Sequence, residues 1–216
     1  MKLRMNLLKK IKIKMFGTKI LEERHSKYNK DIKIVKSLGL GTYIQVNGLT
    51  QSGGIVESIW KSTFKKINNK DIKNCLILGL GGGTVAKLIR KKYPKAKIAG
   101  IEIDPLMVQL GNVYLELKKS KVDIKIQDAF KLTKGIFDLI IVDIYCGNKY
   151  PKKFENEKFL DNIKKILSNN GLVVFNRLFY KDNKKDALNF ERKLKQNFKK
   201  VDFFYPLSNL MFICRK

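Results

Sequence analysis

A glycine-rich turn followed by an acid has the residue types and spacing that could bind a nucleoside. Residues 74–83 read NCLILGLGGG, an apolar run that meets glycines at alternate positions, Gly79, Gly81 and Gly83. The next apolar run ends on Glu102. Glycines let the backbone approach a ligand closely, and an acid at the end of the second strand accepts hydrogen bonds from ribose hydroxyls. The pattern therefore predicts a site for an adenosine-bearing cofactor.

The spacing of the glycines narrows the class of cofactor. A dinucleotide fingerprint, G-x-G-x-x-G, would need a glycine where this chain has Thr84. The observed G-x-G-x-G form is associated with S-adenosylmethionine-type ligands, which bring no pyrophosphate to the helix N-terminus. A tight turn alone can also require glycines, because glycine adopts positive φ without strain. The acid at position 102 and the order of the elements favour the nucleoside interpretation.

Two further acids are predicted to lie at the same edge of the sheet as Glu102. Asp128 follows the third apolar run, and Asp143 ends the fourth. The carboxyl ends of parallel strands form the edge at which open α/β sheets bind ligands. Each acid taken singly could instead be a helix cap or a solvated loop residue. Together they predict partners for ribose hydroxyls, an adenine amino group and a cationic sulfur centre.

The elements that must position these residues follow from hydrophobic periodicity. Residues 18–52 contain short alternating runs broken by glycines, which predicts strands, and residues 55–68 carry an apolar stripe at helical spacing. Asp104 and Pro105 predict an N-cap and the first position of a helix. Strands are expected at 74–79, 97–102, 122–127, 137–143 and 171–177, helices at about 83–93, 105–118, 154–168 and 183–197, and closing strands near 199–205 and 209–214. This alternation predicts a parallel sheet covered on both faces.

Composition limits the class of protein. The chain has 216 residues, 44% of them apolar, which suits one α/β domain with a small appendage. Its net charge is +27, but 40 of the 46 basic residues are lysine and they are scattered over nearly every element. Base-reading and bidentate phosphate contacts favour arginine, so specific nucleic-acid binding is not the favoured interpretation. The basic start, residues 1–17, is expected to be a solvated segment, with an amphipathic helix on an acidic surface as the alternative.

Cysteine and histidine usage argues against a metal site. The three cysteines, Cys75, Cys146 and Cys214, have neither metal-ligand nor disulfide spacing, and the chain has a single histidine. No apolar stretch reaches the roughly 18 residues that a transmembrane helix needs. We therefore expect a metal-free, cytoplasmic protein without a transmembrane segment.

Six short motifs together suggest a family. They are VNGLTQSGG at 46–54, LILGLGGGTV at 76–85, GIEIDP at 100–105, QDAF at 127–130, FDLIIVDIY at 137–145 and NNGLVVFN at 169–176. With these motifs the chain resembles the spermidine synthase-like family of class I S-adenosylmethionine-type transferases, from about residue 20 onward. The resemblance implies an α/β fold with a small N-terminal β domain at 18–54. A Rossmann-like domain would follow at 55–216, with a mostly parallel sheet and an antiparallel last strand.

The resemblance also implies a role for each matching residue. The residues that would bind the cofactor are Gln51 at the adenosyl moiety, Gly79, Gly81 and Gly83 in the nucleoside turn, Glu102 at the ribose, and Asp128 and Ala129 at the adenine. Asp143 would orient the attacking amine and help to deprotonate it, because only a free lone pair can displace the sulfonium-bound carbon. Tyr145 would share a face with Asp143 in an extended segment and lie at the acceptor mouth.

Three departures from the family pattern bear on the reaction. Gly82 stands where an aspartate binds the donor's free amine, Cys146 replaces the second aspartate of the D-x-x-D segment, and Trp60 falls on the acceptor-side tyrosine. A diamine carries two positive charges and needs carboxylates at its far end, so aminopropyl transfer to putrescine is weakened. The acid that methyltransferases place two residues before the first glycine is Ile77 here. Neither donor amine therefore has its usual partner.

Three hypotheses follow for the function. Methyl transfer from S-adenosylmethionine is slightly favoured, and aminopropyl transfer from decarboxylated S-adenosylmethionine to a putrescine-like amine is the first alternative. The second alternative is a non-catalytic protein that binds a nucleoside or nucleic acid. The expected partners are a small-molecule acceptor, an amine, and a second copy of the chain in a homodimer.

Overall fold

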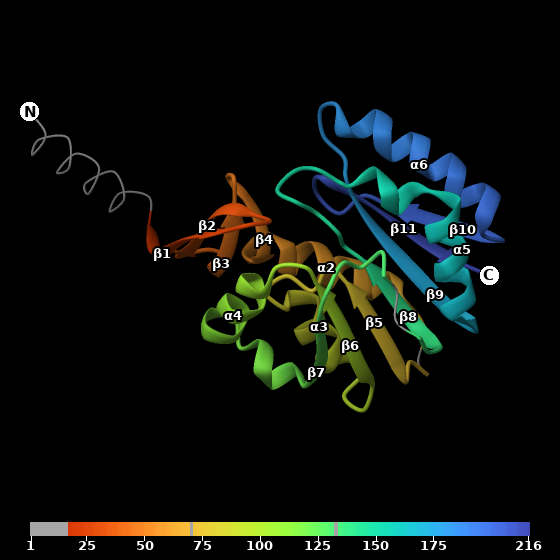
Figure 1. Ribbon diagram of the computed structural model, residues 1–216, viewed down its shortest axis with the longest axis horizontal. Coiled ribbons are helices and arrows are strands. Elements are labelled where there is room, and N and C mark those ends of the chain that lie inside the picture. Colours follow the sequence, from red (N-terminus) through yellow and green to blue (C-terminus); the bar gives the residue numbers. More distant parts are fainter. Residues whose placement is uncertain (1–16, 70, 132–133) are drawn as a thin grey trace, which may run out of the picture.

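The computed structural model describes residues 17–69, 71–131 and 134–216. These residues form a small antiparallel sheet beside a seven-stranded sheet that carries helices on both faces (Figure 1). Residues 1–16 of the basic N-terminal segment predicted at 1–17 lie outside the described residues.

The seven-stranded sheet confirms the predicted mostly parallel arrangement. Its strands are β5 (Asn74–Leu78), β6 (Lys97–Glu102), β7 (Val122–Ile126), β8 (Phe137–Val142), β9 (Leu167–Leu178), β10 (Lys200–Phe204) and β11 (Asn209–Arg215). The spatial order is β10-β11-β9-β8-β5-β6-β7. The strands from β9 to β7 pair in parallel, whereas the last strand, β11, is antiparallel to both of its neighbours.

Helices cover both faces of this sheet because its central strands are apolar on both faces. The helices are α2 (Gly54–Lys66), α3 (Thr84–Lys92), α4 (Pro105–Tyr114), α5 (Glu157–Ile166) and α6 (Asn183–Asn197), with 3₁₀ turns η1 (Leu117–Ser120) and η2 (Lys152–Glu155). Ile77 and Ile141 pack in a core with α2 and α3. Leu76 and Ile140, one position earlier on the same strands, pack in a second core with α5 and α6. Side chains that alternate along a strand thus fill the two cores.

Two predicted helices differ from the observed ones. The helix expected at 105–118 ends at Tyr114, because Glu116 adopts a left-handed backbone with φ of 59° before η1 begins. The helix expected at 154–168 is divided into η2 and α5 by Asn156, whose side chain accepts a hydrogen bond from the Phe159 N–H and caps α5. A side chain that binds backbone N–H groups locally starts a new helix at that point.

The small sheet confirms the strands predicted in residues 18–52. It consists of β1 (Thr18–Ser26), β2 (Lys30–Ser37), β3 (Gly41–Val46) and β4 (Leu49–Gly53), paired antiparallel in chain order. Ile32 and Ile34 on β2 and Ile44 on β3 point to one face and pack with Met107 and Leu110 of α4. The small sheet is therefore held on the larger one through α4.

Asp104 joins the two sheets as well as capping α4. One carboxylate oxygen accepts a hydrogen bond from the Leu106 N–H at 3.0 Å, which confirms the predicted N-cap. The other accepts from the Ser26 hydroxyl at 2.5 Å and the Asn29 side-chain amide at 2.7 Å. Because this buried acid sits two residues beyond Glu102, the end of β1 is fixed close to the end of β6.

Candidate functional site

A cavity of about 230 Å³ opens at the carboxyl ends of β5, β6 and β8. Eight of the nine predicted site residues line it: Gln51, Gly79, Gly81, Glu102, Asp128, Ala129, Asp143 and Tyr145. The ninth, Gly83, is absent from its walls. The structure therefore brings the three predicted carboxylates around one cavity beside the glycine turn.

Different contacts exclude a side chain at each glycine of the turn. Gly79 has φ of 86°, and a Cβ there would lie 2.1 Å from the Asp143 carbonyl oxygen. The ends of β5 and β8 can therefore approach this closely only if residue 79 is glycine. Gly83 has φ of 90° at the start of α3, and a Cβ there would lie 2.3 Å from Leu117. Gly83 therefore serves the turn and its packing against η1, which is a role that the nucleoside pattern did not predict.

Glu102 is buried and holds the glycine turn. Its Oε2 accepts a hydrogen bond from the Gly81 N–H at 2.7 Å, and its Oε1 accepts from Ile103 and Asp104 N–H groups at 2.9 and 3.0 Å. Burial raises the pKa of Glu102 above its ordinary value, although these N–H groups oppose the shift. A carboxylate has about four acceptor positions, so one on Oε2 is left for a ligand hydroxyl.

Asp128 is paired with a lysine that the sequence did not point to. The Lys153 ammonium contacts the Asp128 carboxylate, and the Phe130 N–H donates to its Oδ1 at 2.9 Å. Burial by itself would raise the pKa of Asp128, but Lys153 and the Phe130 N–H outweigh it and hold the pKa below its usual value. Lys153 also lines the cavity, so the ion pair forms part of its wall.

Asp143 is held by donors on both carboxylate oxygens. Trp60 of α2 donates its indole N–H to Oδ2 at 3.0 Å, and Asn176 of β9 donates its side-chain amide to Oδ1 at 2.8 Å. Asn209 of β11 in turn donates to the Asn176 side-chain oxygen at 2.7 Å. Burial raises the pKa of Asp143 to about 6, against the two hydrogen bonds. The two donors thus fix the carboxylate in place.

A second cavity, of about 110 Å³, shares part of its wall with the first, including Asp143. Asp143, Gln51, Val56 and Tyr145 line both cavities. Ile55, Ile59 and Leu178 give the second cavity an apolar wall, and the remaining lining residues are Leu49, Thr50, Trp60, Gly147, Asn176, Tyr180, Ser208 and Asn209. Asp143 therefore belongs to the walls of both cavities.

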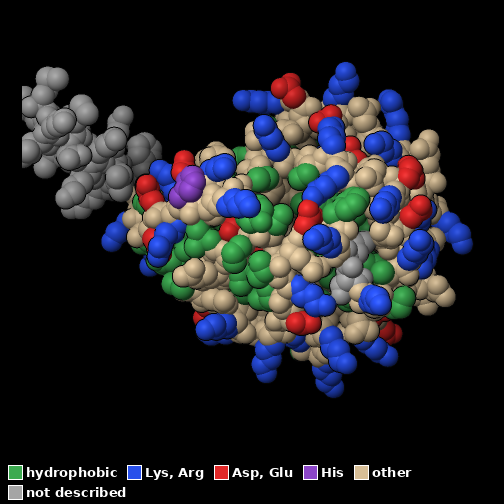
Figure 2. All heavy atoms as spheres, viewed as in Figure 1, with side chains coloured by type: hydrophobic (Ala, Val, Ile, Leu, Met, Phe, Trp, Pro, Cys, Tyr) green, Lys and Arg blue, Asp and Glu red, His purple; other side chains and the backbone are tan. Residues whose placement is uncertain are grey.

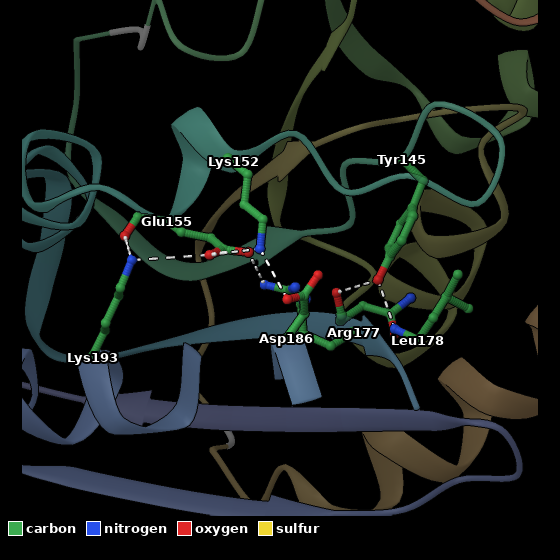
Figure 3. A network of polar contacts seen from close by, with 8 residues as sticks. Tyr145, Lys152, Glu155, Arg177, Leu178, Asp186 and Lys193 are labelled. Carbon is green, nitrogen blue, oxygen red and sulfur yellow. Dashed lines mark hydrogen bonds and ion pairs between the residues drawn. The ribbon is translucent and has the colours of Figure 1, made fainter. Parts of the chain in front are cut away.

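Tyr145 lines both cavities, but its hydroxyl is bound to the backbone of β9 (Figure 3). The Leu178 N–H donates to this hydroxyl at 2.6 Å, and the hydroxyl donates to the Asn176 carbonyl at 3.4 Å. Burial raises the pKa of Tyr145 above its ordinary value. These contacts favour a positioning role for the ring over proton transfer by the hydroxyl.

A buried ion pair anchors the segment that closes the first cavity (Figure 3). Arg177 and Glu155 are 3% and 5% exposed, and their Nη1 and Oε1 atoms are 2.8 Å apart. The Arg177 guanidinium also lies 4.0 Å from the centre of the Tyr150 ring. Since Glu155 ends η2, the pair fixes the residues that η2 places in the cavity wall, Lys153 and Phe154.

Basic side chains extend around the face shown in Figure 2, over both sheets and their helices. Among the described residues, no group of three or more His, Cys, Asp and Glu side chains is placed to hold a metal ion. In the same part of the chain, none of the helices has the length and apolarity needed to cross a bilayer. The homodimer, the cytoplasmic location and the absence of specific nucleic-acid binding stay predictions.

The Trp60 contact gives a direct prediction for Asp143. Trp60→Phe removes one hydrogen bond to the charged carboxylate, so the pKa of Asp143 is expected to rise above its value of about 6. A carboxyl-carbon NMR titration of the labelled protein measures this directly. Phe64→Leu is the matched control, because Phe64 packs against Trp60 with ring centroids 6.0 Å apart. An unchanged midpoint in Trp60→Phe would contradict the proposed stabilisation.

The fold and the site define a class of protein. A seven-stranded sheet in this order, with its last strand antiparallel and an acid-lined cavity beside a glycine turn, is the architecture of class I methyltransferase-like transferases. A sequence profile of the spermine/spermidine synthase domain matches residues 61–208, and the chain belongs to this family.

The relatives include proteins named for aminopropyl transfer and for methyl transfer, the two reactions expected from the sequence. A polyamine aminopropyltransferase of Clostridium botulinum is 30% identical over 173 residues, which cover 74% of this chain and 61% of that protein. The eEF1A lysine and N-terminal methyltransferase homolog of Drosophila melanogaster is 31% identical over 117 residues, covering 48% of this chain and 17% of that protein. This chain therefore spans less than two thirds of either relative.

A solved structure shows the same fold. The probable spermidine synthase from Corynebacterium glutamicum has a TM-score of 0.74 at 18% identity, covering 91% of this chain and 80% of that one. The family and fold predicted from the sequence are thereby confirmed, and the residue roles stay proposals.

Proposed function

We propose that this chain transfers an alkyl group from an S-adenosylmethionine-type sulfonium donor to an amine, with methyl transfer as the first candidate. The observation that carries the proposal is the position of Asp143, a residue that lines both the acid-lined cavity and the smaller second cavity. A donor in the first and an acceptor in the second would meet at this group. Positioning two reactants in this way removes much of the entropic cost of a bimolecular step.

The first cavity suits the donor's adenosine. The free acceptor position on Glu102 Oε2 would take a ribose hydroxyl, and Asp128 beside the buried Ala129 would receive the adenine amino group. Gly79 and Gly81 let the backbone reach the nucleoside without side chains in between. The donor is S-adenosylmethionine in the first candidate function and its decarboxylated form in the second.

The chemistry proposed at Asp143 is proton removal and orientation. The amine lone pair attacks the carbon attached to sulfur, the new C–N bond forms as the C–S bond breaks, and sulfur leaves as a neutral thioether. The acceptor binds as an ammonium, so the Asp143 carboxylate accepts one of its protons before the attack, and the alkylated nitrogen then carries the positive charge. Its donors, Trp60 and Asn176, keep the carboxylate aimed while it does so.

Aminopropyl transfer is the second candidate, favoured by the clostridial relative, whose match covers 74% of this chain. The geometry around Gly82 weighs against it. A Cβ at this position would lie 2.7 Å from Ile44 and 2.9 Å from Leu115, and Gly82 does not line the first cavity. An aspartate at position 82, where the family binds the donor's amine, would therefore face the small sheet in this chain.

By-product analysis separates the candidates. The protein is incubated with S-adenosylmethionine or its decarboxylated form, together with putrescine and cell extract. S-adenosylhomocysteine as the by-product supports methyl transfer, and methylthioadenosine supports aminopropyl transfer. Retained nucleoside binding without either by-product would overturn both and favour the non-catalytic alternative.

Glu102→Gln is expected to weaken nucleoside binding by about 10- to 150-fold, the range for a lost hydrogen bond to a charged group. Glutamine is preferred to alanine because the structure shows Glu102 accepting three backbone N–H groups, and Oε1 can still serve two of them. Calorimetry with S-adenosylhomocysteine and methylthioadenosine measures the affinity. Glu116→Gln, an exposed acid outside the cavity, is the control. Equal affinity in the two variants would remove Glu102 from the ribose site.

A further inference from the structure

We infer that the acceptor is a monoamine, with one ammonium group on an aliphatic stem and an uncharged far end. This inference rests on the proposed function, because it assigns the second cavity to the acceptor. It is carried by the charges of that cavity and not by the identity of any relative.

The second cavity contains a single ionised group. Among the described residues that line it, Asp143 is the only acid, and none is lysine, arginine or histidine. This is notable in a chain with 46 lysines and arginines and 19 acids. The one negative charge belongs to Asp143, which also lines the donor cavity, so the reacting nitrogen is expected near it.

A second ammonium on the acceptor would have no counterion. Its stem would run along Ile55, Ile59 and Leu178, which offer no polar group. Thr50 and Ser208, which also line the cavity, are neutral. An ammonium that gives up part of its hydration without an ionic partner incurs a cost that a hydroxyl or methyl end does not. The cavity therefore selects against a diamine and in favour of an isosteric monoamine.

The family departure at Cys146 lies outside the second cavity and does not alter its charge. The side chain that replaces the second D-x-x-D aspartate is neutral, and its thiol donates to the Tyr28 carbonyl at 3.0 Å. Cys146 lines the donor cavity and is absent from the walls of the second one. A charge at position 146 would therefore not reach the far end of the acceptor.

The test compares three amines of the same length: putrescine, 4-aminobutan-1-ol and n-pentylamine, which end in an ammonium, a hydroxyl and a methyl group. Their affinities are measured by calorimetry on the full chain saturated with S-adenosylhomocysteine, and again with methylthioadenosine. At least one neutral-ended amine is expected to bind ten times more tightly than putrescine. A fourth ligand, N-acetyl-lysine methylamide, mimics a lysine side chain in a protein. Tighter binding of this ligand than of the free monoamines would indicate a protein side chain as the acceptor.

A charge introduced at Ser208 should reverse the preference. Ser208→Asp adds a carboxylate at the wall of the second cavity, and Ser208→Asn is the matched neutral control. Putrescine affinity is expected to rise at least tenfold in the first variant only.

Putrescine binding as tightly as its neutral analogues in the unaltered chain would overturn the inference, and so would no binding of any amine. Neither result would contradict the proposed transfer reaction, because that reaction is tested separately by the nucleoside by-product formed with cell extract.

Discussion

Asp143→Asn is expected to lower kcat by about 10²- to 10⁴-fold, the usual contribution of a positioned acid–base group, and to change donor affinity little. The amide cannot accept the proton that the attacking amine loses. It also cannot satisfy both of its neighbours, because Trp60 and Asn176 each direct an N–H at a carboxylate oxygen, and an amide offers only one oxygen. Single-turnover rates with saturating donor measure the chemical step, and calorimetry measures donor binding.

The pH dependence gives an independent check on Asp143. Its pKa is about 6, so the rate is expected to rise with pH through that value as the carboxylate becomes ionised, and Asp143→Asn should lack this limb. The stability effect has the opposite direction. Because the pKa in the folded state exceeds the ordinary value of 3.8, the folded protein loses stability as pH rises from about 4 to about 6. That loss should be absent in the variant.

Controls make the result specific to this carboxylate. Asp161→Asn removes an exposed acid on α5 that pairs only with Lys164 among the described contacts, and it should leave rate and pH profile unchanged. If Asp143→Asn turns over at the rate of the unaltered chain, Asp143 has no catalytic role. If both variants lose activity equally, the loss reflects net charge and not the site.

The sequence was sufficient for features that depend on short stretches. Alternating and helical periodicities placed most strands and helices, and the acids Glu102, Asp128 and Asp143 were found because they follow strands whose ends share one edge. The glycine pattern was less specific. Gly79 lines the predicted cavity. Gly83, in the same run of glycines, is instead required by the close packing of Leu117, which lies in η1.

Contacts between distant elements could not be predicted in the same way. The chain of hydrogen bonds from Trp60 through Asp143 and Asn176 to Asn209 joins α2, β8, β9 and β11. It depends on the register of β11 against β9, in which Met211 is opposite Asn176. Nothing in the local pattern around Asn176 or Asn209 sets that register. The Lys153–Asp128 pair likewise requires the position of η2.

The Arg177–Glu155 pair is expected to show the largest stability effect among the side chains around the site. Arg177→Met should lower the free energy of unfolding by about 3–5 kcal/mol, because it leaves the Glu155 carboxylate buried without its closest partner. Lys152 and Lys193 lie 3.8 and 4.0 Å from Glu155, and their exposed ammonium groups are weaker substitutes (Figure 3). Urea denaturation measures the change.

The double variant Glu155→Leu with Arg177→Met separates the cost of an unpaired charge from the value of the pair. Replacing both buried charges by apolar side chains should recover most of the lost stability, because no ion is then left without a partner. Glu57→Gln, which removes an exposed pair with Lys61, should change stability by less than about 1 kcal/mol. A double variant no more stable than Arg177→Met would mean that packing of the guanidinium on Tyr150, and not charge pairing, holds this wall. Nucleoside affinity should follow the same order, since η2 carries Lys153 into the donor cavity.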